Sequence, residues 1–156
     1  MTKKTGKKNS QDQIAEILEG IQSESRVQEM KNYIQHGRTT TYEHCENVAR
    51  LSCAIDRKLS LGSDINALVT GAMLHDFFLY DWHDSELSLE SLHGFHHPKI
   101  ASQNARKYLD VDDRTSHVID THMWPFTITK IPLSREAWIV CVADKAVSLY
   151  ETIFRR

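Results

Sequence analysis

The amino-acid sequence predicts an all-α fold built as a single domain. Along most of its 156 residues, apolar side chains recur at intervals of three and four, which is the spacing of one face of an α-helix. Residues that commonly cap helices precede these repeats, and no segment alternates polar and apolar residues as a half-buried strand does. We therefore expect a bundle of about six to seven helices over residues 11–156, preceded by a disordered, lysine-rich tail over residues 1–10.

Three helices are expected in the first third of the chain. The first covers residues 11–23 and has an apolar face made of Ile14, Ile17, Leu18 and Ile21. A shorter helix follows, with Gly37 as its stop signal. Thr40 and Glu43 have the T-x-x-E spacing of a capping box, so they open a third helix whose apolar face begins with His44.

Two more helices are expected in the middle of the chain. Ser63 is the expected cap of the first, in which His75 lies on an inward face. Pro98 suits the first position of a helix, so the second is expected to run from that residue to about residue 109. The segment between these two helices, residues 81–94, is expected to be a loop, within which residues 86–92 could form a short helical turn.

The last two helices are expected after residue 111. Asp112 begins the first, which carries His122 on its apolar stripe and ends before Pro125, because a proline disfavours helix in the residue before it. Residues 126–132 are expected to form a loop. Ser134 then caps a long final helix that is apolar almost all round in its first half.

The composition excludes several classes of partner. With 19 Lys+Arg against 21 Asp+Glu and a net charge of −2, the chain does not have the basic surface of a protein that binds duplex nucleic acid. The longest uninterrupted apolar run, residues 137–143, is far shorter than the ~20 residues needed to cross a membrane. Three cysteines without a C-x-x-C spacing fit a reducing compartment. We therefore expect a cytoplasmic protein without membrane or duplex nucleic-acid partners.

Six side chains able to bind a metal ion are expected on inward helix faces or at helix ends. They are His44, His75, Asp76, His97, His122 and Asp144. Burying an imidazole with an unsatisfied nitrogen costs roughly 1–3 kcal/mol and burying an unpaired carboxylate costs several, so these groups should converge on one another or on a cation. A mixed set of imidazole nitrogens and carboxylate oxygens suits Mn, Fe, Co, Ni or Zn better than Ca or Mg. We expect one or two such divalent transition metals as cofactor.

The order of these residues resembles the HD superfamily of metal-dependent phosphohydrolases, in the variant with two additional histidines between the HD pair and the final aspartate. The segments that carry the resemblance include Leu74-His75-Asp76 and Val142-Ala143-Asp144-Lys145, within about residues 36–153. The resemblance implies an all-α core in which one metal ion is held by His44, His75, Asp76 and Asp144. It also implies that His97 and His122 hold a second ion and that Asp76 bridges the two.

Two adjacent residues compete for one of these ligand positions, His96 and His97. We choose His97 because, by the resemblance, a small residue lies four positions after the ligand, and Ala101 fills that place.

The activity that the resemblance implies is hydrolysis of a phosphate ester or anhydride of a nucleotide or related small molecule, through a hydroxide that bridges the metal ions. Asp76, His75 and Lys145 would be catalytic, and Lys145 would offset the charge of Asp144 or meet a substrate phosphate. The expected substrate-binding residues are Arg38 as a phosphate clamp and Trp82 and His83 at the pocket mouth.

Two other functions stay open at this point. A non-catalytic module could use the same pocket to sense a nucleotide or a metal ion, and it would bind nucleotide tightly without hydrolysing any phosphate substrate. A di-iron oxygenase could use the same ligands, and it would consume oxygen when reduced and loaded with iron.

Overall fold

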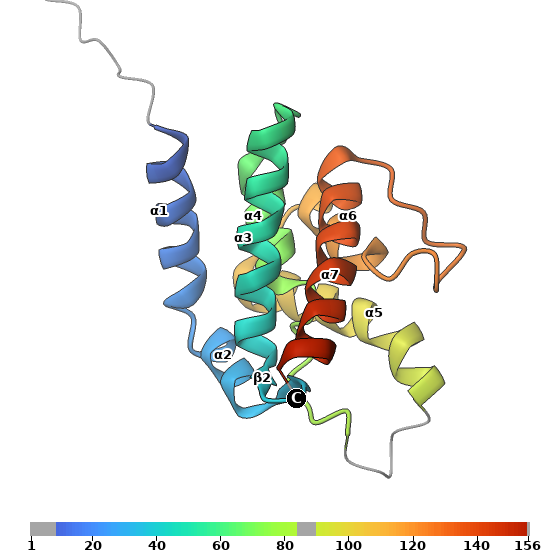
Figure 1. Ribbon diagram of the computed structural model, residues 1–156. Helices are drawn as coiled ribbons and strands as arrows, with labels where there is room; N and C mark the ends of the chain where they lie inside the picture. Colours follow the sequence, from blue (N-terminus) through green and yellow to red (C-terminus); the bar gives the residue numbers. More distant parts are fainter. Residues whose placement is uncertain (1–8, 84–89, 156) are drawn as a thin grey trace, which may run out of the picture.

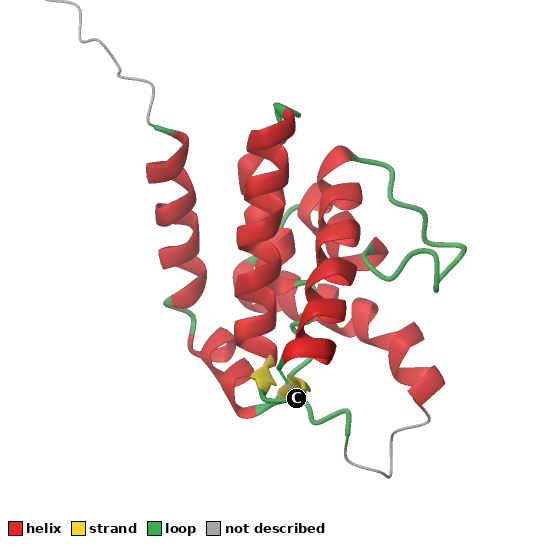
Figure 2. Cartoon of the chain, in the orientation of Figure 1, coloured by secondary structure: helices red, strands yellow, loops and turns green. Residues whose placement is uncertain are grey.

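The computed structural model describes residues 9–83 and 90–155, and within these ranges the chain is mostly helical (Figures 1 and 2). The α-helices are α1 (Ser10–Gln22), α2 (Ser25–Gln28), α3 (Thr41–Leu59), α4 (Ile65–Leu74), α5 (Glu90–Leu109), α6 (Asp113–Thr121) and α7 (Arg135–Phe154). Between α2 and α3 lie a short 3-10 helix, η1 (Glu29–Asn32), and two short strands, β1 (Ile34–His36) and β2 (Thr39–Thr40). The predicted all-α class is confirmed.

Helix α4 forms the centre of the protein. All of its residues from Ala67 to Leu74 are buried, and it packs against α1, α3, α6 and α7. Figure 1 shows α3 in front of α4, with α1 on one side and α7 on the other. The backbone of α4 comes so close to α6 that a Cβ added at Gly71 would lie 2.6 Å from Val118 Cγ1. This close packing delivers the C-terminal end of α4, and the residues after it, into the interior.

Three of the predicted helix caps are confirmed. Thr40 and Glu43 form the capping box of α3, in which the Thr40 side chain accepts from the backbone N–H of Glu43 and the Glu43 carboxylate accepts from that of Thr40. Asp112 caps α6 and Ser134 caps α7. The sequence therefore located the starts of these helices correctly.

The cap of α4 differs from the prediction by one residue. Asp64, not Ser63, is the N-cap, and its carboxylate accepts a hydrogen bond from the backbone N–H of Ala67. The backbone N–H of Ser63 donates instead to the carboxylate of Asp56 at the end of α3. Both residues suit a cap, and this contact with α3 decides between them.

Helix α5 begins earlier than predicted. It starts at Glu90 and contains Pro98 in its interior, so the predicted start at Pro98 is wrong, and the last part of the predicted loop over residues 81–94 is helical. A proline inside a helix removes one backbone hydrogen bond and costs about 3 kcal/mol. Pro98 and the preceding His97 are both buried, and this tertiary packing outweighs the local preference. Residues 84–89 lie outside the described residues.

A two-stranded hairpin replaces the end of the second predicted helix. Strands β1 and β2 pair in antiparallel fashion, with Ile34 opposite Thr40. Gly37 turns the chain with a φ of 58°, a left-handed conformation that glycine adopts without a steric penalty. Strands of two and three residues are too short to show the alternation by which strands are predicted.

The predicted tail over residues 1–10 lies outside the described residues except for Asn9 and Ser10, and Ser10 already belongs to α1. All three cysteines are free. None of the described helices is long and apolar enough to cross a membrane.

Candidate metal centre

The six predicted metal ligands meet in the interior of the protein. All six are buried: His44, His75, Asp76, His97, His122 and Asp144. Helix ends supply three of them, because His75 is the C-cap of α4, Asp76 follows it, and His122 is the C-cap of α6. The other three project from within α3, α5 and α7. Five helices that are separate in the sequence thus contribute to one cluster.

One half of the cluster lies around Asp144. Its Oδ1 lies 3.1 Å from His44 Nε2 and 3.5 Å from His75 Nε2. Asp76 Oδ2 approaches the same two nitrogens, at 3.8 Å from His44 and 3.4 Å from His75. Ligands that are about 2.0–2.2 Å from one ion lie roughly 3–4.4 Å from one another. The donor atoms of His44, His75 and Asp144 lie close enough together to hold a cation, and Asp76 Oδ2 lies beside them.

The other half of the cluster lies around the second oxygen of Asp76. Asp76 Oδ1 lies 3.1 Å from His97 Nε2 and 3.4 Å from His122 Nε2. The two imidazole nitrogens are 3.0 Å apart. Asp76 therefore directs one oxygen into each half of the cluster.

Hydrogen bonds at the far side of three rings turn their Nε2 atoms toward the carboxylates. The Nδ1–H groups of His75 and His122 donate to the backbone carbonyls of Ala72 and Ile119, each at 2.7 Å. The Nδ1–H of His44 donates to Glu151 Oε2 at 2.8 Å. A carbonyl or carboxylate can only accept, so each Nδ1 carries a proton, and in the neutral form of each ring Nε2 is the nitrogen whose lone pair can bind a metal ion. This is the usual arrangement of histidines that bind metal ions.

The charges in the cluster are strongly coupled. Burial alone would lower the pKa of His44, but its hydrogen bonds to Asp144 and Glu151 raise it to about 10. Burial also opposes protonation of His75, yet the charge of Asp76 raises its pKa well above 6.5. Conversely, burial would raise the pKa of Asp76 and Asp144, but the neighbouring histidines hold both well below the usual value. Protons on the histidines and a divalent cation are thus alternative ways of balancing two buried carboxylates.

Two atoms of the cluster indicate that a cation fits here. His75 Nε2 and Asp76 Oδ1 are buried yet form no hydrogen bond of acceptable geometry with the described residues. An unsatisfied buried polar atom costs about 1–3 kcal/mol, and one such atom lies in each half of the cluster. A divalent cation in each half would satisfy both atoms, and the mixed nitrogen and oxygen donors suit a transition metal.

A cavity of about 550 Å³ opens beside the cluster. Of the remaining predicted site residues, Lys145 and Trp82 line this cavity. Arg38 and His83 are exposed, and neither is among the described residues that form its wall. Their roles in substrate binding stay predictions, as does the catalytic role of Lys145.

The structure also separates the two adjacent histidines of α5. His97 is buried and points into the cluster, whereas His96 is exposed. The choice of His97 agrees with this placement.

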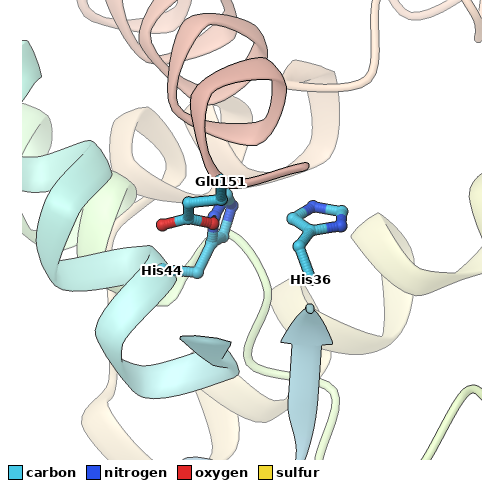
Figure 3. Close-up of side chains that lie close together, drawn as sticks. All are labelled: His36, His44 and Glu151. Carbon is cyan, nitrogen blue, oxygen red and sulfur yellow. The ribbon is translucent and has the colours of Figure 1, made fainter. Parts of the chain in front are cut away.

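Three residues near the cluster were missed by the sequence analysis: Gln35, His36 and Glu151. Figure 3 shows Glu151 of α7 beside His44 of α3, with His36 of β1 across from them. The rings of His36 and His44 are 5.4 Å apart, and these three side chains could themselves hold an ion. Glu151 lies about two helical turns after Asp144, so helical spacing could have found it. Gln35 and His36 lie in a strand that gave no periodic signal.

One comparison with known proteins found a match. A family model described as HD domain matches residues 41–148, a span that is more than half of the chain and contains all six clustered residues. Searches of curated proteins and of solved structures found no match.

Proposed function

The chain belongs to the HD domain family, and from this we propose that it is a metal-dependent phosphohydrolase. The proposed reaction is hydrolysis of a phosphate ester or anhydride in a nucleotide or a related small molecule. The observation that carries the proposal is the placement of Asp76, whose two oxygens enter two separate groups of histidine nitrogens.

In this proposal each half of the cluster holds one divalent transition metal ion, such as Mn, Fe, Co, Ni or Zn. The ligands would be His44, His75 and Asp144 for one ion, His97 and His122 for the other, and Asp76 for both. When bound, such ions supply Lewis acidity that activates water and polarises a phosphoryl oxygen. The chain itself contributes orientation, because hydrogen bonds to Ala72, Ile119 and Glu151 hold three of the rings in place.

Lys145 supplies positive charge at the wall of the cavity. Its Nζ donates to the carbonyl oxygens of His122 at 2.8 Å and Cys141 at 3.3 Å, which fixes the ammonium group at the C-terminal end of α6. Its third contact, at 3.4 Å, is with the Sγ of Cys141, a weak acceptor. A phosphate oxygen would be a stronger partner, so we expect Lys145 to exchange this sulfur contact for the substrate.

The size and lining of the cavity support a substrate with an apolar, nucleotide-sized body. About 550 Å³ is within the range of small-molecule sites, roughly 300–1,000 Å³. Beyond the metal ligands, the wall includes Trp82, Met123, Pro125 and Phe126. Phe126 stacks on Phe95 with ring centroids 4.8 Å apart and remains half-exposed. Such a supported aromatic ring is suited to stack on a nucleobase.

Metal analysis followed by phosphatase assays tests this proposal. The purified protein would be loaded with Mn, Co, Ni, Fe or Zn and assayed for phosphate release from nucleoside mono- and triphosphates and dinucleoside polyphosphates. We expect close to two metal equivalents and hydrolysis of at least one of these substrates. Asp76→Asn should abolish turnover, whereas the exposed Asp113→Asn on α6 serves as the matched control and should leave turnover unchanged.

Three outcomes would contradict the proposal. Full activity of Asp76→Asn would remove the bridging carboxylate from the mechanism. Tight nucleotide binding without hydrolysis under any metal would identify a sensing module instead. Oxygen consumption by the reduced, iron-loaded protein, in the absence of phosphate release, would identify an oxygenase.

The stacking role of Phe126 leads to a separate prediction. Because stacking of a base on an aromatic ring contributes about 1–3 kcal/mol, Phe126→Ala should raise KM for a nucleoside monophosphate by roughly 5- to 150-fold. The KM for glycerol phosphate, which has no ring, should not change. Ile128→Ala, at a more exposed position in the same loop, is the control. An equal change for both substrates would show that Phe126 does not contact a base.

A further inference from the structure

Gln35 is a buried polar residue in an otherwise accessible strand. In β1 its neighbours Ile34 and His36 are exposed and half-buried, whereas Gln35 is only 7% exposed. Its Nε2 donates a hydrogen bond of 2.7 Å to Asp76 Oδ2. A residue 41 positions away in the sequence thus contacts the carboxylate that joins the two halves of the cluster.

The chemistry of the partners fixes the orientation of the Gln35 amide. Asp76 presents a carboxylate oxygen to Gln35 at 2.7 Å, and a carboxylate oxygen accepts hydrogen bonds. The Gln35 atom facing it must therefore be the NH₂ group. The amide oxygen accepts in turn from Thr41 Oγ1 at 3.3 Å, and Thr41 is buried at the start of α3. The amide is thus held at both ends.

This contact constrains the rotation of the Asp76 carboxylate. With Oδ2 bonded to Gln35, Oδ2 remains in the half of the cluster that contains His75, and Oδ1 points toward His97 and His122. Without the amide, both oxygens could turn toward one ion. The other half of the cluster would then keep only His97 and His122 as ligands.

We propose that Gln35 is a positioning residue that keeps Asp76 in its bridging orientation and thereby determines whether a second metal ion is held. This inference rests on the binuclear centre proposed above. It assigns Gln35 no contact with the substrate and no part in proton transfer.

Manganese titration of the full chain tests the proposal. Gln35→Met has a side chain of similar length and lacks the donor. Isothermal titration calorimetry should show two Mn²⁺ equivalents for the wild type. For Gln35→Met the first ion should bind normally and the second about 10- to 100-fold more weakly. Electron paramagnetic resonance should show an exchange-coupled manganese pair in the wild type and mainly the signal of isolated Mn²⁺ in the variant.

Two further variants provide the controls. Gln28→Met removes a side-chain amide that donates to the carbonyl oxygen of Gln22 in the α1–α2 region, and it should bind both ions as the wild type does. Thr41→Val removes the hydroxyl that anchors the Gln35 amide oxygen. It should therefore lower the affinity for the second ion, but by less than Gln35→Met does. Thermal unfolding shows which variants are folded.

The possible results separate this inference from the proposed function. Two ions bound with wild-type affinity and an unchanged coupled signal in Gln35→Met would overturn the role of Gln35 alone. If folded Gln35→Met bound both ions more weakly by the same factor, the role of Gln35 would also be overturned. A wild-type chain that takes up a single ion would overturn the binuclear centre, and this inference with it.

Discussion

At the scale of single residues, the orientation of His44 depends on a charged partner outside the cluster. His75 and His122 donate to backbone carbonyls, whereas His44 donates to the buried carboxylate of Glu151. Glu151 is held in turn by the side-chain amide of Asn47 at 3.0 Å. Because hydrogen bonds to an ionised acceptor are roughly twice as strong as neutral ones, Glu151 would make His44 a better ligand in the proposed metal centre.

We therefore predict that Glu151→Gln weakens metal binding while the fold is retained. The introduced amide oxygen can still accept from His44 Nδ1–H, but the negative charge is lost. Loss of such a partner typically lowers metal affinity about 10- to 100-fold, which Mn²⁺ calorimetry would measure. Glu46→Gln, the same change at a surface position of α3 that pairs with Arg50, is the control. Equal affinities of Glu151→Gln and the wild type would contradict this role.

The burial of some of the six clustered side chains could be predicted because helical spacing fixes the direction of a side chain, whereas the choice of His97 depended on the family resemblance. His44 and Asp144 lie on inward faces of long, well-capped helices, so their burial follows from the positions of their neighbours. The contact of Gln35 with Asp76 depends instead on how a short hairpin packs against the end of α4. No local pattern encodes that packing, so the sequence analysis missed Gln35.

At the scale of secondary-structure elements, the close approach of α4 and α6 depends on Gly71. An added Cβ would lie 2.6 Å from Val118 Cγ1 and 2.8 Å from Val118 Cβ, and the Cβ atom of a buried valine cannot move without its helix. Alanine is favoured over glycine in a helix by up to about 1 kcal/mol, but overpacking costs about 1–3 kcal/mol. We predict that Gly71→Ala lowers the free energy of unfolding by about 1–2 kcal/mol, measured by urea denaturation.

A double-mutant cycle provides the control for this clash. Val118→Ala alone should destabilise the protein by leaving a cavity. In the double variant the two changes should compensate in part, so that its loss of stability is smaller than the sum of the single losses. Strict additivity would show that Gly71 and Val118 do not interact.

A buried carboxylate at the start of α7 links that helix to α4 and α6. Glu136 is fully buried, accepts from the backbone N–H of Asp64 at 2.7 Å, and lies 3.3 Å from the guanidinium of Arg114. Burial would raise its pKa, but these partners lower it below the usual 4.5. A carboxyl group with a lowered pKa stabilises the fold above its ordinary pKa, and this contribution is lost as the pH falls through the folded value.

We predict that Glu136→Gln lowers the free energy of unfolding by about 1–3 kcal/mol at neutral pH. The difference in the free energy of unfolding between Glu136→Gln and the wild type should shrink as the pH falls below 4.5, because the wild-type carboxyl then becomes protonated. Urea denaturation at several pH values measures this. A difference that stays constant down to about pH 3 would show that the charge of Glu136 is not involved.

Which elements could be predicted depends on the range of the interactions that define them. The capping box of Thr40 and Glu43 is made by four consecutive residues, so the local sequence was sufficient to predict where α3 starts. The start of α5 ahead of Pro98 depends on the burial of that residue. The preference of proline for the first position of a helix predicted instead that the helix starts at Pro98. Local rules thus fail where tertiary packing outweighs them.

At the scale of the whole molecule, the cluster of six buried histidine and aspartate side chains connects α3 with α4, α5, α6 and α7. Its residues lie between positions 44 and 144, so closing the cluster brings together most of the chain. The unfolded chain does not hold these residues together, and an ion that binds the folded protein alone stabilises it by mass action. Metal binding and folding are therefore expected to be linked.

The last prediction concerns how this linkage depends on pH. His44 and His75 have raised pKa values in the folded protein, so their protonation stabilises the fold fully below pH 6.5. This stabilisation declines as the pH rises above 6.5, and for His44 it is lost as the pH passes about 10. Metal ions replace these protons, so the stability of the metal-loaded protein should not decline in this way.

Mn²⁺ at about 100 times its Kd should add about 2.7 kcal/mol to the free energy of unfolding, or roughly 5–10 °C to Tm. The difference in Tm between Mn²⁺-loaded and chelator-treated protein should widen between pH 6.5 and about pH 8, as measured by differential scanning calorimetry, and should be much smaller in Asp144→Asn. A difference that narrows with rising pH would contradict the competition between protons and metal ions in this cluster.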